Sequence, residues 1–95
     1  MQMVVGLLTL EIILPGSNSL KEKRLALKSI KDKVRNRFNV SIAEIDYQEK
    51  WQRTKLGIVQ IGNDYKYIDK NLQSIFNLID QYDLIEIVHH NLEFL

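Results

Sequence analysis

The sequence predicts an α+β domain of the ferredoxin-like kind, with split βαββαβ order, a four-stranded antiparallel sheet and two helices on one face. Two segments repeat apolar residues with the period of an amphipathic helix, and four others are short β-branched or apolar runs bounded by turn residues. Along the chain these segments follow one another as strand, helix, strand, strand, helix and strand. Right-handed crossovers then place both helices on the same side of the sheet.

The size and composition of the chain favour one domain over residues 1–95. At 95 residues, 45% of them apolar, one hydrophobic core forms but a second does not. The absence of cysteine excludes disulfides, thiolate metal sites and cysteine nucleophiles. The first residues lack the basic segment and cleavage site of a secretory signal, and no apolar run is long enough to span a membrane. We therefore expect a cytoplasmic protein that does not enter the membrane.

The first strand is predicted over residues 3–14, where alternate positions are apolar or glycine. Residues 15–18 end the strand, and Ser19 followed by Glu22 matches a capping box that starts a helix. That helix is expected over residues 20–38. Its apolar side consists of Leu20, Leu27, Ile30, Val34 and Phe38.

The second and third strands are predicted over residues 40–47 and 51–61. The polar link between them is so short that it joins antiparallel neighbours, which makes a hairpin. After a turn at residues 62–64, a second amphipathic helix is expected to residue 82, and residues 84–95 form the last strand.

The face of the sheet opposite the helices has no covering layer in this fold, yet it is predicted to carry apolar side chains. Because an uncovered apolar face usually finds a partner, we expect a homo-oligomer, specifically a dimer. The candidates for this face are Met3, Val5, Leu7, Val40 and Ile42.

The first helix is strongly basic. Residues 21–37 hold eight Lys or Arg against two acids, so the segment carries +6 and the rest of the chain −5. Rows of cations on a helix suit the phosphate backbone of RNA or of a ribosomal particle, whereas an ordinary solvated face and an acidic protein partner are the alternatives. The residues predicted to contact nucleic acid are Lys21, Lys23, Arg24, Lys28, Lys31, Arg35 and Arg53.

The start of the same helix is a candidate anion site. Ser17 and Ser19 precede Lys21 there, and a helix N-terminus with free N–H groups beside a cation attracts phosphate. Simple capping is the alternative, because Glu22 competes for the same N–H groups.

The two histidines do not predict a metal or catalytic site. His89 and His90 are adjacent on a strand, so their side chains point to opposite faces and cannot bind one metal together. No nucleophile or orienting partner stands at a recognisable spacing. We expect no catalytic residue, no metal, no cofactor and no small-molecule substrate.

Acidic residues on the strands allow a further alternative. Glu11, Glu44 and Asp46 could gather around a hard cation, but ion pairs with Arg53 and Lys55 on the neighbouring strand are favoured.

Trp51 is the single tryptophan of the chain and stands where the hairpin enters its return strand. An aromatic side chain beside arginine could stack on a base, although one aromatic at a hairpin end is more often packing. The sheet lacks the paired aromatics of an RNA-recognition motif, so the helix is the better candidate surface.

Three segments carry a resemblance to a known family: LPGSNSLKEKR at residues 14–24, RFNVSIAEID at residues 37–46, and WQR at residues 51–53 followed by Leu56 and Gly57. Over essentially all of its length the chain resembles the YlxP-like bacterial proteins. The resemblance implies a ferredoxin-like domain and no catalytic residue. Genes of such proteins often lie among translation and ribosome-maturation genes, which implies a role linked to RNA or the ribosome. The matching positions are Lys21, Glu22, Lys23, Arg24, Trp51, Gln52 and Arg53.

The function expected from the sequence is therefore a non-enzymatic contact with RNA or a ribosomal particle through the basic first helix. Two alternatives stay open. One is a homo-oligomeric interaction module that uses the open sheet face, and the other is a small-ligand-binding domain of the ACT type, by analogy of fold alone.

Overall fold

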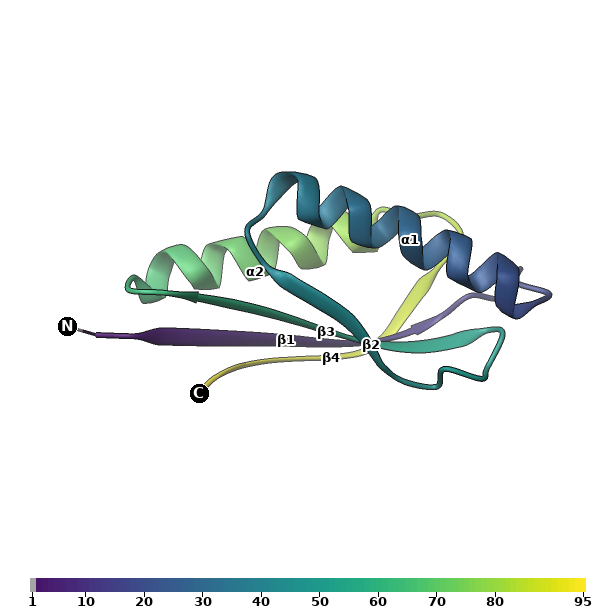
Figure 1. Ribbon diagram of the computed structural model, residues 1–95, viewed down its shortest axis with the longest axis horizontal. Coiled ribbons are helices and arrows are strands. Elements are labelled where there is room, and N and C mark those ends of the chain that lie inside the picture. Colours follow the sequence, from purple (N-terminus) through teal and green to yellow (C-terminus); the bar gives the residue numbers. More distant parts are fainter. Residues whose placement is uncertain (1) are drawn as a thin grey trace.

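A computed structural model describes residues 2–95 and has the element order that the sequence predicts. Figure 1 shows both helices lying together on one face of the sheet, with the other face left open. The arrangement is α+β and ferredoxin-like, as predicted. Its elements are β1 (Val4–Ile13), α1 (Leu20–Arg37), β2 (Ser41–Asp46), β3 (Arg53–Gly62), α2 (Tyr65–Asp80) and β4 (Glu86–Phe94).

The four strands form one antiparallel sheet in the order β2-β3-β1-β4. Strand β1 is central, and its residue Leu8 faces Ile58 of β3 on one side and Leu92 of β4 on the other. The register shifts once in each outer pairing, between Glu11 and Ile12 beside β4 and between Glu44 and Asp46 in β2. Strands β2 and β4 are therefore the two edges of the sheet.

The core lies between the sheet and the two helices. Along β1 the side chains alternate between buried and half-buried, which is the pattern of a strand with one face in the core. Leu27, Ile30 and Val34 of α1 are buried against this face, and α2 contributes its own apolar stripe beside them. All of these side chains belong to one continuous hydrophobic cluster.

The open face carries only part of the apolar set predicted for it. Val5 and Leu7 lie on this face because they alternate with the buried residues of β1, and Met3 just before β1 is 70% exposed. The prediction for Ile42 was wrong: it is 3% exposed and pairs with the buried Ile58, so it faces the helices. Val40 precedes β2 and packs against the core instead.

The molecule is elongated, with extents of 48 × 21 × 18 Å. In Figure 1 the two chain ends lie together at the left, whereas the β2–β3 connection and the start of α1 lie at the opposite end. The backbone N–H of Leu95 donates to the carbonyl of Val5, which ties the two end segments to each other. Neither helix in the described part of the chain is long and apolar enough to cross a membrane.

Candidate nucleic-acid interface

Helix α1 begins at the capping box that the sequence predicts. The backbone N–H of Glu22 donates to the Ser19 hydroxyl oxygen at 3.1 Å, and the backbone N–H of Asn18 donates to the Glu22 carboxylate at 3.0 Å. These bonds satisfy N–H groups that have no partner inside the helix. The cap thereby fixes where the helix starts.

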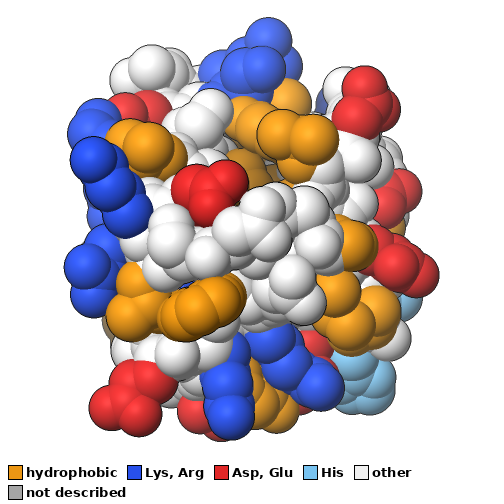
Figure 2. Space-filling model, turned by 90° about the vertical axis from the view of Figure 1, so that its right-hand side faces the viewer, with side chains coloured by type: hydrophobic (Ala, Val, Ile, Leu, Met, Phe, Trp, Pro, Cys, Tyr) orange, Lys and Arg blue, Asp and Glu red, His pale blue; other side chains and the backbone are white. Residues whose placement is uncertain are grey.

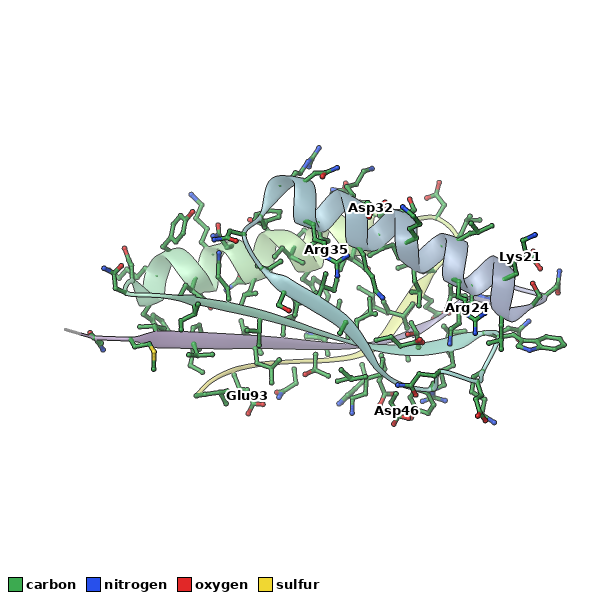
Figure 3. All side chains as sticks on the ribbon, in the orientation of Figure 1. Lys21, Arg24, Asp32, Arg35, Asp46 and Glu93 are labelled. Atoms are coloured by element: carbon green, nitrogen blue, oxygen red, sulfur yellow. The ribbon has the colours of Figure 1, made fainter. Side chains whose placement is uncertain are left out.

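One flank of α1 carries a row of basic side chains beside the edge strand β2. Figure 3 shows Arg24 and Arg35 extending from α1 toward the sheet, and Figure 2 shows basic side chains along its left margin, where α1 and β2 lie. The spacing of three and four residues keeps the row on one side of the helix, next to the buried stripe. We call these residues the basic row: Lys21, Arg24, Lys28, Lys31 and Arg35.

Two members of the basic row have protein partners. Lys28 forms an ion pair with Asp32 at 2.7 Å, and its hydrogen bond holds the pKa of the Asp32 carboxyl below the ordinary value. Arg35 donates to the backbone carbonyl of Ile42 at 3.0 Å, so it covers a carbonyl of β2. Among the described residues, the other three members form no ion pair.

A groove of about 280 Å³ lies along this flank. Its lining combines four cations of the basic row with two carboxylates, Asp32 and Glu44, so cations are in excess. A cationic groove of this kind can accept an anionic chain, because phosphate oxygens accept hydrogen bonds from Lys and Arg.

Lys23 is not part of this surface. It is 1% exposed, and its ammonium forms an ion pair with Glu44 at 2.8 Å. It also donates to the backbone carbonyls of Tyr47 at 2.7 Å, Gln48 at 3.4 Å and Arg53 at 3.2 Å. The prediction that Lys23 contacts nucleic acid was wrong, because a side chain so deeply buried cannot reach a phosphate.

Arg53 also lies away from the basic row. Its guanidinium contacts the carboxylate of Glu11 at 3.0 Å and lies 4.7 Å from the centroid of the Tyr47 ring. The hydrogen bond with Glu11 is the main reason that the pKa of Arg53 is raised. Glu11 belongs to the open face of the sheet, so Arg53 is not a member of the row along α1. It forms the cross-strand ion pair that the sequence favours.

The predicted anion site at the start of α1 is occupied by the chain itself. Ser17 is 8% exposed, and its hydroxyl donates to the backbone carbonyl of Ser19. The hydroxyl of Ser19 accepts from the backbone N–H of Glu22. The Glu22 carboxylate takes the Asn18 N–H group that an anion would need. Lys21 is exposed beside this cap and contributes to the basic row only.

The remaining candidate side chains do not converge. Glu11 faces the open side of the sheet, whereas Glu44 turns to the helix side and accepts a hydrogen bond from the buried Thr54 at 2.6 Å. His89 lies opposite Glu11 in the pairing of β4 with β1. The ring of His90 lies on the helix side, with its centroid 4.8 Å from the centroid of the Phe76 ring. Within residues 2–95, no three of the acidic and histidine side chains gather as potential metal ligands.

Two features of this end of the molecule differ from what the sequence predicts. The first is the role of Lys23, although a signal for it existed: the spacing from Lys23 through Leu27 and Ile30 to Val34 is the spacing of the buried stripe. The second is the exposure of Trp51: its place in the sequence allows base stacking but favours packing, whereas the side chain is 55% exposed. Nothing in the sequence reveals that exposure, because it depends on how the hairpin sits.

A profile for the family described as "Protein of unknown function (DUF503)" matches residues 5–92, a span that includes both helices and nearly all of the sheet. The chain belongs to the DUF503 family. "Uncharacterized protein YlxP" of Bacillus subtilis (strain 168) is 43% identical over 83 residues, which cover 87% of this chain and 90% of that protein. The predicted resemblance to the YlxP-like proteins is thus confirmed.

The fold of this DUF503 chain also occurs in a solved structure of unrelated sequence. "De novo designed protein Foldit4" superposes with a TM-score of 0.59 at 14% identity, covering 99% of this chain and 97% of that one. At so low an identity the likeness concerns the fold alone. Any function for this DUF503 chain has to be argued from its own surface.

Proposed function

We propose that this protein contacts RNA, free or in a ribosomal particle, through the basic row of α1, and that it does so without catalysing a reaction. The observation that carries the proposal is the excess of cations on one flank of one helix. Lys21, Arg24 and Lys31 have no ion-pair partner among the described residues, so their charges are free to meet phosphates.

The geometry of the row suits an extended polyanion. From Lys21 to Arg35 the helix rises by roughly 21 Å at 1.5 Å per residue, enough to follow several consecutive phosphates. A helix holds its side chains in fixed order, so the row forms a continuous track rather than scattered charges. Contacts of this kind release counterions from the nucleic acid and need no base-specific hydrogen bonds.

The test is binding of a labelled single-stranded RNA, followed by fluorescence anisotropy over a salt series. We expect the double variant R24E/K28E to bind much more weakly than the unchanged protein and to show a shallower salt dependence. Each lost phosphate contact reduces the slope of log affinity against log salt by about 0.7 for a single strand.

The matched control is K66E/K70E, which reverses two exposed lysines on α2 and changes the net charge by the same amount. It is expected to retain most of the affinity. If the two double variants lose affinity equally, the binding depends on net charge alone and not on the basic row. If the unchanged protein fails to bind RNA at low salt, the proposal is refuted.

Self-association through the open sheet face is a second proposal. It is supported by side chains that no helix covers: Met3 is 70% exposed and Ile61 63%, and the half-buried Val5, Leu7 and Val59 lie beside them in register. A two-fold dimer would bury this face against its own copy. The molar mass from sedimentation equilibrium at increasing concentration is the measurement that decides it.

A further inference from the structure

Trp51 occupies an unusual position for a large aromatic side chain. It is 55% exposed at the tip of the β2–β3 hairpin, although a tryptophan can bury 150–250 Å² when it packs, by the general range for aromatic residues. It is also the only tryptophan of the chain. A role in the core is therefore excluded, and more than half of the side chain is accessible to a partner.

The backbone on both sides of Trp51 is held in place. Before it, the carbonyls of Tyr47 and Gln48 accept from the buried ammonium of Lys23. After it, the side chain of Gln52 donates to the backbone carbonyls of Pro15 at 3.1 Å and Ser17 at 3.0 Å, and the Gln52 carbonyl accepts from the N–H of Leu14 at 2.9 Å. The tip is thus fastened to α1 and to the loop before it.

The hairpin adopts a backbone conformation that these bonds maintain. Tyr47 has φ 63°, in the left-handed region that a residue with a side chain seldom adopts. The backbone N–H of Lys50 closes the turn on the Tyr47 carbonyl at 3.0 Å. Because the backbone of the tip is held before any partner arrives, binding of a ligand to Trp51 costs little backbone conformational entropy.

The surroundings of Trp51 favour an anionic ligand that carries flat groups. A hollow of about 610 Å³ opens beside the ring and is lined by Lys50, by the acidic Glu49 and by Arg53, whose charge is paired with Glu11. The excess of positive charge near Trp51 therefore comes from the basic row. Figure 3 shows Lys21 and Arg24 at this same end of the molecule, and Figure 2, which views that end, shows apolar side chains among basic ones. The basic row therefore begins where the tryptophan is presented.

We propose that Trp51 stacks on an unpaired base of single-stranded RNA whose phosphates follow the basic row. The inference rests on the proposed RNA contact and adds the kind of RNA that is bound, which is a strand with at least one unpaired base that can unstack from its neighbours. Stacking on an aromatic ring tolerates any base, because each base has a π-face. A fully paired duplex cannot make this contact without opening.

The single tryptophan supplies a direct readout. The emission of Trp51 is measured while the full chain is titrated with three polyanionic probes: a single-stranded RNA of about ten nucleotides, the matching RNA duplex, and inorganic polyphosphate. We expect strong quenching with the single strand and little with the duplex or polyphosphate, because only the single strand offers a free base.

Variants are compared by anisotropy of the labelled single strand. W51A is expected to bind about tenfold more weakly, W51Y to retain most of the affinity, and W51A to bind the duplex as the unchanged protein does. The control is Y67A, which removes another exposed aromatic side chain, 60% exposed, from the first turn of α2. Thermal unfolding of each variant verifies that the fold is kept.

The outcomes separate the two proposals. If R24E/K28E loses binding while W51A binds the single strand normally and Trp51 emission does not change, the stacking is overturned and the phosphate contact stands. Equal quenching by polyphosphate also overturns the stacking. If none of the three probes binds the unchanged protein at low salt, both proposals fail together.

Discussion

At the scale of single residues, the ammonium of Lys23 determines how the hairpin sits against α1. It contacts the Glu44 carboxylate at 2.8 Å and three backbone carbonyls of the hairpin, and Glu44 in turn accepts from Thr54. A buried charge is tolerated when it is paired and its remaining hydrogen bonds are satisfied. Lys23 meets both conditions, so it acts as a structural cation.

We expect K23M to lower the free energy of unfolding by about 3–5 kcal/mol, because the change leaves the Glu44 carboxylate and the hairpin carbonyls without their partner. K21M, on the exposed neighbour two residues earlier, is expected to change it by less than about 0.5 kcal/mol. Urea denaturation measures both values. Equal stability of the two variants would show that the buried contacts contribute nothing net.

Residue-scale features were predicted unevenly, for a physical reason. The surface charges of Lys21 and Arg24 could be predicted from the sequence, because the charge of an exposed side chain depends on its residue type and little on its neighbours. The environment of Lys23 arises from carbonyls more than twenty residues away, at Tyr47, Gln48 and Arg53. Only its position in the buried stripe indicates that it points inward.

At the scale of elements, the close packing of α2 on β1 depends on Gly6. A Cβ atom placed there would lie 2.7 Å from Cδ1 of Leu72 and 2.8 Å from Cγ2 of Ile68. Both neighbours are buried, Leu72 at 0% exposure and Ile68 at 1%, so they have little room to move. The missing side chain therefore lets the helix approach the central strand.

Gly6→Ala is expected to destabilise the protein by about 1–3 kcal/mol, since the added methyl overpacks this contact. Gly16 offers a matched substitution, because a Cβ atom there would meet nothing within 4 Å. Gly16→Ala should stay within about 0.5 kcal/mol of the unchanged protein. Thermal or chemical unfolding of the pair checks this, and similar values for both variants would contradict it.

The elements themselves were largely predictable. The periods of the two helices are strong signals, and their observed bounds, Leu20–Arg37 and Tyr65–Asp80, differ from the predicted ones by at most two residues. The face of β2 was not predictable in the same way. Ile42 and Ile45 are three residues apart, so on a regular strand they point to opposite faces. The register shift between Glu44 and Asp46 also interrupts the alternation from which the buried face of a strand is predicted.

At the scale of the whole molecule, the two layers carry different surfaces. The helical layer presents the basic row, whereas the open sheet face presents apolar side chains around Val5, Leu7 and Val59. Its charged groups, such as Glu11 and Arg53, already pair with each other. The proposed phosphate contact of the basic row and the proposed self-association would therefore use opposite sides of one molecule.

If the open face forms a dimer, Ile61→Lys should shift the protein toward monomer, because it places a charge in an apolar interface. Leu25→Lys is the matched control: Leu25 is 61% exposed on α1, close to the 63% of Ile61. Sedimentation equilibrium reports the molar mass of each. A monomeric unchanged protein at high concentration, or equal behaviour of the two variants, would refute the dimer.

The candidate site was predictable only as a charge pattern. The net charge of the first helix and the spacing of its cations follow from the sequence, because they need only the period of a helix. Which cations stay at the surface, and where Trp51 is held, depend on the hairpin packing against α1. Such contacts join residues distant in the chain, and apart from the position of Lys23 in the buried stripe no local pattern indicates them.

The location of both chain ends at the same end of the molecule has a practical consequence. They lie at the end of the molecule away from the β2–β3 hairpin (Figure 1). A tag, dye or surface linker attached at either end would therefore be remote from Trp51 and from the first turn of α1. A protein immobilised through one terminus would present its hairpin end outward, accessible to ligands in solution.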